Sequence, residues 1–490
     1  MPNADVDGLY SAFKAKDRRF DGRFFVGISS TGIYCRPVCR AKMPKPENCT
    51  FYKTAAEAEN AGFRPCLLCR PESAPSVSVT KSSATPANRA AKILEKECGS
   101  KLNQEEIAAR LGCTSRHLNR VFKAEYRVSP GQYLQTCRLL LAKSLLAETN
   151  LPISDVARAA GFGSLRHFNA SFKKHYRLTP TEIRNQKQKN EKQTDSITLS
   201  LGYRPPYPWH QVLDFLETRA IPGVEKIQNG EYMRAVHIET EGEHRYGWVK
   251  VGHNSDKNAL SITISASLLP VLSDVLFRIR RLFDLNCDPE LIYEILSTMN
   301  EIKPGLCILG TRLPGCFNSY EMAVRAVLGQ QITVKAARTL ALRMTAAYGT
   351  PVQTGIEGLT HTFPAPEKIA SLSESITDSL GPLGIIATRA KTISALSQAF
   401  MDDSICFDAC VCPEAEMEKL KKIPGIGPWT AKYIAMRAME WPDAFLETDA
   451  GIKKALAPLT EKETAEMAKK WRPWRSYATI NIWNSLKENE

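Results

Sequence analysis

Four cysteines in the N-terminal part of the chain form two closely spaced pairs. Cys35 and Cys39 are separated by three residues, and Cys66 and Cys69 by two. Each pair can hold one edge of a tetrahedral ion, so the two pairs predict a single four-cysteine site for Zn²⁺. The sequence has 14 cysteines and no signal-peptide pattern at its start, which favours a reducing, cytoplasmic compartment of bacterial type where paired cysteines bind metal.

The thiolates of such a site could also do chemistry. Four thiolates around one Zn²⁺ leave an excess of negative charge, so the sulfur atoms stay nucleophilic. Five basic residues near the pairs would hold a DNA backbone against them: Arg36, Arg40, Lys42, Arg64 and Arg70. A zinc site that only stabilises a small domain is the alternative that the spacing leaves open.

A second chemical feature lies near the C-terminus, in residues 420–449, which read LKKIPGIGPWTAKYIAMRAMEWPDAFLETD. Pro424, Gly425 and Gly427 predict a tight turn between two helices, and the free N–H groups at such a turn suit a DNA phosphate. Asp449 precedes another apolar segment. The spacing alone leaves open whether this carboxylate is a helix N-cap or a catalytic group.

The segment resembles the helix-hairpin-helix and Gly/Pro-Asp motif of the HhH-GPD superfamily, most closely that of the AlkA-type 3-methyladenine DNA glycosylases. The likeness extends through residues 471–477 and Trp483, and back to residues 325–330. The resemblance implies that Asp449 is the catalytic carboxylate. It also implies a base pocket formed by Trp429, Tyr433, Trp483 and Phe215, and a DNA-binding hairpin and wedge formed by Pro424, Gly425, Gly427, Gln330 and Gln331.

The reaction that this resemblance implies needs few catalytic groups. An alkylated purine is already cationic, so its glycosidic bond is weak and the leaving base needs no proton. One carboxylate can then stabilise an oxocarbenium-like sugar and orient a water, while aromatic faces hold the flipped base. Trp429 stands where bifunctional relatives carry a Schiff-base lysine, which implies hydrolysis without strand cleavage. Two residues depart from the AlkA pattern: Gln331 replaces a leucine wedge, and Ala450 replaces an aromatic residue beside the aspartate.

The cysteine pairs lie in the segments TGIYCRPVCRA, residues 31–41, and GFRPCLLC, residues 62–69, which resemble the N-terminal domain of the Ada family. The resemblance implies that Cys35 takes a methyl group irreversibly from a DNA methylphosphotriester. Such a reaction is a direct displacement at the methyl carbon, with a phosphodiester as leaving group. Methylation would remove one negative charge from the site and so raise its affinity for DNA.

An internal repeat lies between residues 88 and 184. The segment IAARLG at 107–112 is echoed by VARAAG at 156–161, and YRVSP at 126–130 by YRLTP at 176–180. Each copy predicts a helix, a glycine turn and a second helix, and the doubling resembles the AraC-type DNA-binding domain. The residues expected to face the major groove are Ser115, Arg116, Asn119 and Arg120 in the first copy, and Ser164, Arg166, His167 and Asn169 in the second.

These features predict a multidomain, mainly helical chain. Its expected parts are a small α+β zinc domain with four cysteine ligands at 1–75, a linker at 76–87, an AraC-type double helix-turn-helix domain at 88–184, a linker at 185–195, a small AlkA-like α+β domain at 196–284, and a two-lobed all-α HhH-GPD domain at 285–490. The net charge of +13 is concentrated in the first 195 residues, which indicates double-stranded DNA as the partner. No apolar run is long enough for a membrane span.

The expected function is the repair of alkylated DNA and its regulation: base excision through Asp449, methyl transfer to Cys35 and activation of transcription, with RNA polymerase as a further partner. The expected cofactors are one Zn²⁺ and a monovalent cation at the hairpin. No iron–sulfur cluster is expected, because no cysteine follows Cys412, and no metal is assigned to Cys406, Cys410 and Cys412. The alternative is a transcription regulator whose C-terminal part binds DNA without catalysis.

Overall fold

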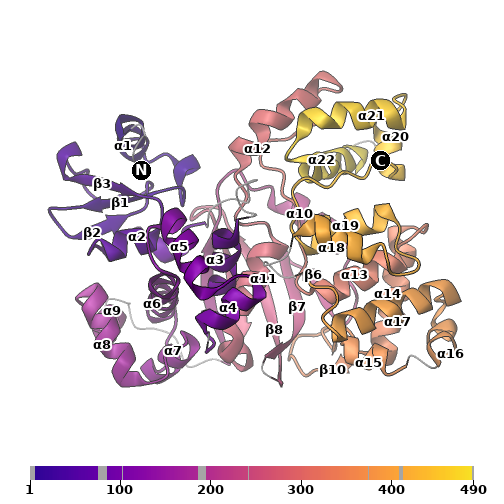
Figure 1. Ribbon diagram of the computed structural model, residues 1–490, viewed down its shortest axis with the longest axis horizontal. Helices are drawn as coiled ribbons and strands as arrows, with labels where there is room; N and C mark the ends of the chain where they lie inside the picture. The colour runs from indigo at the N-terminus through magenta and orange to yellow at the C-terminus, as the bar shows by residue number, and fades with distance from the viewer. Residues whose placement is uncertain are drawn as a thin grey trace. The chain divides into compact units, whose positions relative to one another are not determined.

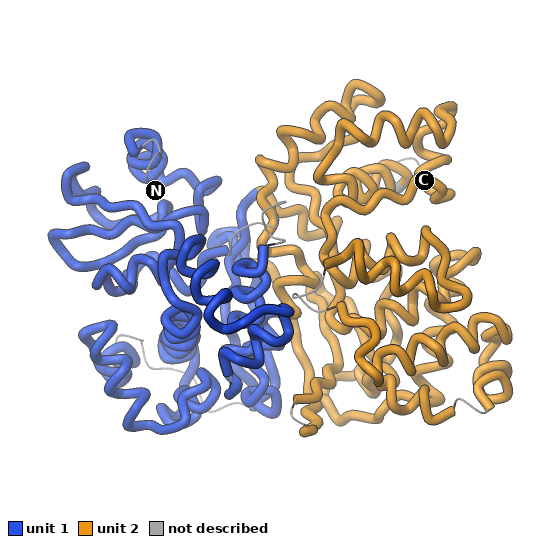
Figure 2. Tube along the Cα trace, viewed as in Figure 1, with its two compact units in different colours: residues 1–205, 254–277 blue, residues 206–253, 278–490 orange. Residues whose placement is uncertain are grey.

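The computed structural model describes residues 6–75, 85–101, 103–185, 195–240, 242–372, 375–407 and 412–487. Most of the two expected linkers lies outside these residues. The chain divides into two compact units (Figure 2): residues 1–205 with 254–277, and residues 206–253 with 278–490. The segment 196–284, expected as one small domain, is therefore shared between the units, because its first and last strands belong to the first unit.

The N-terminal part of the first unit is a four-stranded sheet with short helices (Figure 1). Its elements are α1 Val6–Lys14, η1 Arg18–Phe20, β1 Phe25–Ile28, β2 Ile33–Cys35, η2 Pro46–Asn48, β3 Cys49–Tyr52, α2 Ala55–Asn60, β4 Arg64–Pro65 and η3 Pro71–Ser73, with the sheet order β3-β1-β2-β4. Strands β2 and β4 pair in parallel, with Tyr34 opposite Pro65. Since Cys35 ends β2 and Cys66 follows β4, this pairing brings the two cysteine segments together.

The next part of the first unit is helical and repeats itself. Its helices are α3 Pro86–Lys96, α4 Gln104–Arg110, α5 Ser115–Tyr126, α6 Pro130–Glu148, α7 Ile153–Ala159, α8 Leu165–Tyr176 and α9 Pro180–Asn185. Gly112 and Gly161 turn the chain with φ angles of +65° and +78°, in the left-handed region that glycine adopts without strain. Phe122 and Phe172 are fully buried at equivalent positions of the two copies. The structure therefore confirms the doubled helix-turn-helix arrangement.

Two antiparallel strands complete the first unit. They are β5 Ser196–Gly202 and β9 Ala259–Ser265. The short helix η5 Ala266–Val271 follows β9. Apolar residues alternate along both strands, and Leu199, Ile262 and Ile264 are buried. This period of two is the strand pattern that the sequence shows at residues 259–265.

The second unit begins with one helix and three antiparallel strands: α10 Trp209–Glu217, β6 Glu225–Gln228, β7 Glu231–Thr240 and β8 Glu243–Asn254. The described residues after β9 are helical apart from the hairpin of β10 Thr350–Pro351 and β11 His361–Thr362. The helices are α11 Leu272–Leu282, α12 Pro289–Leu296, η6 Ser297–Glu301, α13 Ser319–Leu328, α14 Val334–Tyr348, α15 Pro366–Ala370, α16 Ile376–Leu380, η8 Gly381–Leu383, α17 Ala387–Met401, α18 Pro413–Leu420, α19 Pro428–Ala438, α20 Ala450–Ala455, α21 Glu461–Met467, η9 Ala468–Trp471 and α22 Arg475–Lys487.

One apolar core fixes the helices that carry the candidate site of this unit. Val324 and Leu328 of α13, Ile393 and Leu396 of α17, and Ile434 of α19 are fully buried in the same cluster. Burial of this kind is the dominant favourable contribution to folding, so α19 and the turn before it are held firmly. None of the helices in the described part of the chain is long and apolar enough to cross a membrane.

Candidate functional sites

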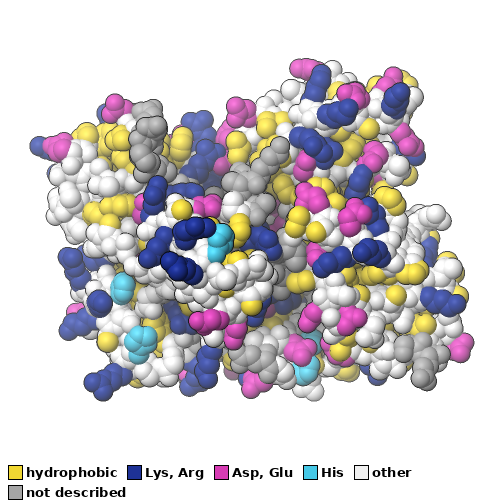
Figure 3. All heavy atoms as spheres, viewed as in Figure 1, with side chains coloured by type: hydrophobic (Ala, Val, Ile, Leu, Met, Phe, Trp, Pro, Cys, Tyr) yellow, Lys and Arg dark blue, Asp and Glu magenta, His cyan; other side chains and the backbone are white. Residues whose placement is uncertain are grey.

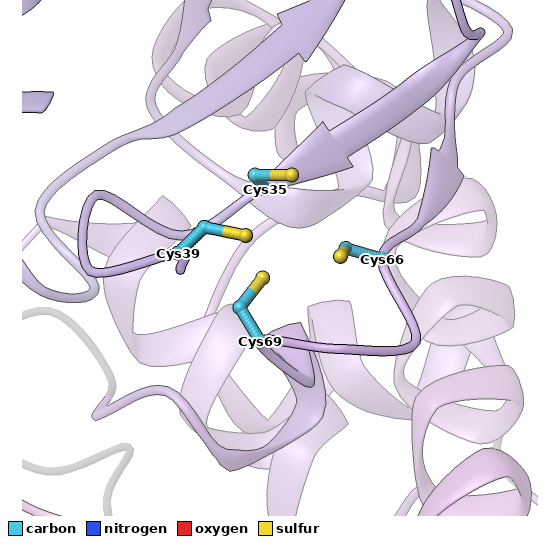
Figure 4. Close-up of side chains that lie close together, drawn as sticks. All are labelled: Cys35, Cys39, Cys66 and Cys69. Atoms are coloured by element: carbon cyan, nitrogen blue, oxygen red, sulfur yellow. The ribbon is translucent and has the colours of Figure 1, made fainter. Parts of the chain in front are cut away.

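The four predicted zinc ligands lie together. The sulfur atoms of Cys35, Cys39, Cys66 and Cys69 are all within 4.8 Å of one another and point toward a common centre (Figure 4). Tetrahedral coordination at a Zn–S distance of about 2.3 Å places sulfur atoms roughly 3.8 Å apart, so the side chains fit the ion with little movement. Hydrogen bonds among the crowded sulfur atoms raise the pKa of Cys35 and Cys69 and lower the pKa of Cys39 and Cys66.

Cys35 differs from the other three cysteines in its hydrogen bonds. The backbone N–H of Arg36 donates to Sγ of Cys69 at 3.3 Å, and the sulfur atoms of Cys39 and Cys66 also accept a backbone N–H. No such bond to Cys35 is found within the described part of the chain. Because an N–H···S bond withdraws charge from a thiolate, Cys35 would keep more negative charge on its sulfur than the other three cysteines once all four are ionised. The residue is 2% exposed, so a reactant must be small to reach it.

Two of the five basic residues near the cysteines are used inside the protein. Arg36 forms an ion pair with Asp21, and Arg70 pairs with two carboxylates. Buried or half-buried charges need such partners, because desolvation of an unpaired ion is costly. Arg40 and Lys42 are exposed and stay available for a DNA backbone.

The segment that carries Cys66 and Cys69, residues 59–72, packs onto helix α6 through buried polar groups. Nζ of Lys143 lies 2.5 Å from the Glu72 carboxylate, with both side chains 2% exposed, and donates to the Cys66 carbonyl at 3.4 Å. Glu59 accepts a hydrogen bond from Thr136 of α6 at 2.9 Å. Burial raises the pKa of Glu59 to about 7. The cysteine site and the helix that joins the two helix-turn-helix copies are therefore held together by groups that separate only at high cost.

The first reading helix, α5, presents a basic surface. Figure 3 shows Lys and Arg side chains, in dark blue, gathered where α5 lies on the visible face. Arg116 is exposed, whereas Arg120 lies with Nη2 at 3.2 Å from Nδ1 of His117. The Asn119 side chain donates to the Ser115 carbonyl at 3.1 Å, so it is turned back onto its own helix. Of the four residues of the first copy expected in the groove, all of which the structure describes, Arg116 is the one that is exposed and whose side chain makes none of these bonds.

The second reading helix, α8, is arranged differently. The hydroxyl of Ser164 accepts the backbone N–H of His167 at 3.2 Å, so Ser164 is the N-cap of the helix. The His167 ring lies edge-on to Phe162, with ring centroids 5.8 Å apart. Arg166 and Asn169 are exposed one turn apart on the same helix. The two copies therefore offer different side chains to DNA, although their folds repeat.

The predicted hairpin lies between α18 and α19. Pro424, Gly425 and Gly427 are all exposed in the turn. Gly425 has a φ of +92°, and a Cβ there would lie 2.1 Å from Oγ1 of Thr392. Only glycine fits this position, which explains why the chain can present its backbone N–H groups at the surface.

The two glutamines of the expected wedge have different surroundings. Nε2 of Gln330 donates to the Gly425 carbonyl at 2.8 Å and to Oγ1 of Thr430 at 3.0 Å. Gln330 therefore braces the hairpin. Gln331 is exposed and has a φ of +54°, a left-handed conformation that costs a residue other than glycine some strain. Gln331 lies in the turn between α13 and α14.

Asp449 is a helix cap that also binds an aromatic side chain. Its Oδ1 accepts the backbone N–H groups of Gly451 at 2.9 Å and Ile452 at 3.1 Å, so it is the N-cap of α20. The same Oδ1 accepts the indole N–H of Trp483 at 2.9 Å. Within the described residues no hydrogen bond is found to Oδ2. The carboxylate is therefore fixed through one oxygen, Oδ1.

The aromatic residues of the expected pocket come together around Asp449. Trp429 and Tyr433, one turn apart on α19, are stacked with ring centroids 5.2 Å apart and an interplanar angle of 12°. The centroids of Tyr433 and Trp483 are 6.3 Å apart. All three are half-buried, so their ring faces remain partly accessible.

Phe215 joins this group through two arginines that sequence reasoning missed. The guanidinium carbon of Arg219 lies 3.8 Å from the centroid of the Phe215 ring, and that of Arg437 lies at 4.7 Å. Nη1 of Arg437 also donates to the Tyr433 hydroxyl at 3.1 Å. The ring expected to hold a cationic base is thus already engaged by two cations. No sequence signal marks these arginines, because an arginine beside an amphipathic helix is usually a solvated surface residue.

The third cysteine group gives no metal site that can be described. Cys410 lies outside the described residues. Sγ of Cys412 donates to Glu414 at 3.3 Å, and the backbone N–H of Cys406 donates to Glu416 at 3.1 Å.

Four family models match successive parts of the chain. Residues 8–72 match the metal binding domain of Ada, residues 107–186 a helix-turn-helix domain, residues 198–318 the AlkA N-terminal domain, and residues 324–476 the HhH-GPD superfamily base excision DNA repair protein. Fold and sites together define a base-excision protein joined to a zinc-binding domain and a DNA-binding domain.

Relatives show the same combination. The chain is 35% identical over 492 residues to the probable bifunctional transcriptional activator/DNA repair enzyme AlkA of Mycobacterium tuberculosis, with 99% of this chain and 97% of that protein covered. It is 34% identical to DNA-3-methyladenine glycosylase 2 of Escherichia coli, over 58% of this chain and 96% of that protein. It is 35% identical to the bifunctional transcriptional activator/DNA repair enzyme Ada of Escherichia coli, over 29% of this chain and 39% of that protein. The chain belongs to the family of bifunctional transcriptional activator/DNA repair enzymes of the AlkA type.

Proposed function

We propose that this chain excises alkylated purines of the 3-methyladenine type through Asp449, takes methyl groups from DNA methylphosphotriesters onto Cys35, and activates transcription once methylated. The observation that carries the base-excision part is the geometry of Asp449. Its Oδ1 is held by two backbone N–H groups and by Trp483, and no hydrogen bond to Oδ2 is found among the described residues.

Asp449 acts by electrostatics in this proposal. As the glycosidic bond breaks, its electron pair leaves with the base, and positive charge develops on the sugar. The free Oδ2 stabilises this charge and orients a water whose oxygen bonds to C1′ of the sugar. Trp429, Tyr433 and Trp483 enclose the flipped base. Since Trp429 stands where a Schiff-base lysine would be needed, the reaction stops at the abasic site.

Cys35 is the methyl acceptor because its sulfur alone is spared an N–H···S bond among those described. A zinc ion bound by Cys35, Cys39, Cys66 and Cys69 would keep the four sulfur atoms as thiolates. The Cys35 sulfur then forms a bond to the methyl carbon while the bond from that carbon to the phosphate oxygen breaks, and the phosphodiester takes the electron pair. Arg40 and Lys42, both exposed, hold the adjoining DNA backbone.

The two helix-turn-helix copies read a promoter in this proposal. Arg116 of α5 and Arg166 and Asn169 of α8 face base edges in the major groove, and RNA polymerase is the partner that is activated. The same DNA-reading surface also includes Ser115, Asn119, Arg120 and His167. At the other end of the chain, the hairpin of Pro424, Gly425 and Gly427 binds a phosphate and holds a monovalent cation, and Gln331 fills the gap that the flipped base leaves.

The test of base excision is release of 3-methyladenine from methylated DNA by the full chain and by its Asp449→Asn variant. Asn is as good an N-cap as Asp and its carbonyl oxygen can accept the same three hydrogen bonds, so the variant keeps the fold and loses the charge. We expect the rate to fall about a hundredfold or more. Equal rates would overturn the assignment of Asp449. No release by the wild-type protein, with DNA binding intact, would favour the non-catalytic regulator instead.

The test of methyl transfer is mass spectrometry of the zinc-loaded chain after incubation with methylated DNA. The peptide that carries Cys35 should gain the mass of one CH₂ group, and the Cys35→Ala variant should gain it at no cysteine. Methylation at another cysteine, or none, would leave the zinc site a purely structural one.

A further inference from the structure

The two reading helices bury equivalent faces. Leu118 and Phe122 of α5 are fully buried, as are Phe168 and Phe172 at the equivalent positions of α8. Each residue turns a helix by about 100°, so the residues two before and two after a buried residue lie on the opposite side. Each reading helix therefore has two outward positions, four residues apart, that point away from the core.

These outward positions carry different side chains in the two copies. They are Arg116 and Arg120 in α5, and Arg166 and Ala170 in α8, and all four residues are exposed. The first outward position is thus an arginine in both copies. The second is a long cation in one copy and a methyl group in the other. Ala170 was not among the residues expected in the groove, because an exposed alanine in a helix usually reflects helix propensity alone.

The histidine three residues before the second outward position also differs in its surroundings. In α5, Nδ1 of His117 lies 3.2 Å from Nη2 of Arg120. In α8 the equivalent His167 lies edge-on to Phe162, with ring centroids 5.8 Å apart. His117 thus restrains the Arg120 guanidinium, which reduces the freedom that this side chain loses when it binds DNA.

The two side chains suit different bases in the major groove. A guanidinium can donate two hydrogen bonds to O6 and N7 of guanine, a pair of acceptors that the other bases do not present. Among the described residues no hydrogen bond of Nε or Nη1 of Arg120 is found, so these donors remain for a base. The methyl group of Ala170 has no donor, and its apolar surface suits the C5-methyl group of thymine.

We infer that the two reading helices recognise different bases at their second outward position: Arg120 of α5 binds a guanine, and Ala170 of α8 contacts the methyl group of a thymine. The inference rests on the promoter reading proposed above and names two bases that it requires. A promoter with the same base at both places would suit one copy only. Thymine offers Arg120 one acceptor where guanine offers two, and guanine offers Ala170 no methyl group.

The experiment selects bound sequences from a randomised DNA duplex with the full, zinc-loaded chain, and repeats the selection with two variants. Ala170→Arg gives α8 the side chain of α5, and Arg120→Ala gives α5 the side chain of α8. Both positions are exposed, so the variants should fold normally. The control is Lys123→Ala, which removes a charge from the last turn of α5.

We expect Ala170→Arg to change one base of the selected sequence from thymine to guanine, and Arg120→Ala to lose the preference for guanine at a different base pair. Replacing that guanine in the wild-type sequence should weaken binding of the wild-type protein about ten- to a hundredfold, and binding of Arg120→Ala hardly at all. Lys123→Ala should weaken binding to both duplexes equally, because contacts to phosphate carry no sequence information.

Deoxyuridine tests the thymine contact, because it differs from thymidine only by the C5-methyl group. The replacement is made at the thymine that the Ala170→Arg selection identifies. Wild-type binding should weaken about three- to fivefold, the effect of one methyl group that is no longer buried. Binding of the Ala170→Arg variant should not change, since its arginine does not use the methyl group.

Failure of the inference is distinct from failure of the proposed function. If both variants select the wild-type sequence unchanged, Arg120 and Ala170 do not read bases, although the promoter reading stands. Equal wild-type binding of deoxyuridine and thymidine at every thymine of the selected sequence would remove the contact assigned to Ala170. If the wild-type protein enriches no sequence, the proposed reading of a promoter is wrong, and the inference falls with it.

Discussion

Trp483 donates its indole N–H to Oδ1 of Asp449 at 2.9 Å, and this oxygen also caps helix α20 through the N–H groups of Gly451 and Ile452. One oxygen of the carboxylate thus serves the fold, while the proposed catalytic role falls to the other. The two residues are 34 positions apart in the chain, and the bond fixes the direction of the carboxylate relative to the aromatic pocket.

Trp483→Phe removes the N–H donor and keeps an aromatic ring beside Tyr433. We expect kcat for release of 3-methyladenine to fall about tenfold, because the carboxylate loses the bond that orients it, with little change in KM. Steady-state kinetics with methylated DNA checks this. Trp441→Phe, at a half-buried tryptophan of the same unit, is the matched control and should leave kcat unchanged. Equal effects of the two substitutions would mean that the hydrogen bond from Trp483 to Asp449 does not matter for base release.

Gly451→Ala tests the space around the carboxylate. A Cβ at this position would lie 3.0 Å from Oδ1 of Asp449 and 3.2 Å from Cδ1 of Trp483, so both must shift. We expect about a tenfold or larger loss of base release, since small displacements of a catalytic group are costly. The control is Gly381→Ala, where a Cβ meets nothing within 4 Å. A fully active Gly451→Ala protein would mean that the position of Asp449 is less critical than its charge.

The tryptophan at position 429 allows the products of the reaction to be predicted. With no lysine at that position, the protein should leave abasic sites in an intact strand, and strands should break only on later treatment with alkali. Gel electrophoresis before and after alkali distinguishes the two cases. Borohydride added during the reaction should trap no covalent protein–DNA adduct. A trapped adduct would show an amine nucleophile and would contradict simple hydrolysis.

The parts of this structure that could be read from the sequence are those encoded by local spacing. The cysteine pairs, the repeated glycine turns at Gly112 and Gly161, and the hairpin at Gly425 are short patterns whose geometry follows from a few neighbouring residues. Asp449 could not be assigned by spacing alone, because a helix cap and a catalytic carboxylate use the same residue type. The structure shows that it is a cap, and its bond to Trp483 depends on packing.

Contacts between distant segments were not predictable. Arg219 reaches Tyr433, and Arg437 reaches Phe215, only because α10 and α19 pack in the same unit. Lys143 meets Glu72 only because α6 packs on the segment that carries Cys66 and Cys69. Periodicity says which face of a helix is buried, but not against which partner.

The raised pKa of Glu59 predicts that the stability of the first unit depends on pH. Burial raises its pKa to about 7, above the ordinary value of 4.5, so the folded protein holds a proton that the unfolded chain releases between these pH values. The stability that this proton contributes is fully present below pH 4.5 and is lost as the pH rises through 7. Glu59→Gln removes this titration. Between pH 5 and pH 8 the variant should therefore gain about 3 kcal/mol in stability relative to wild type.

Thermal unfolding of the zinc-loaded full chain measures this difference in stability. Unfolding is monitored by the release of zinc, because the first unit contains the cysteine site. Both proteins share the ordinary pH dependence of zinc binding, so only the difference between them reports on Glu59. Thr136 donates its hydroxyl hydrogen to Glu59, and that hydroxyl can accept instead of donate when an amide replaces the carboxylate. A loss of stability that is the same at both pH values would therefore mean that Gln packs poorly there and that Glu59 remains ionised in the folded protein.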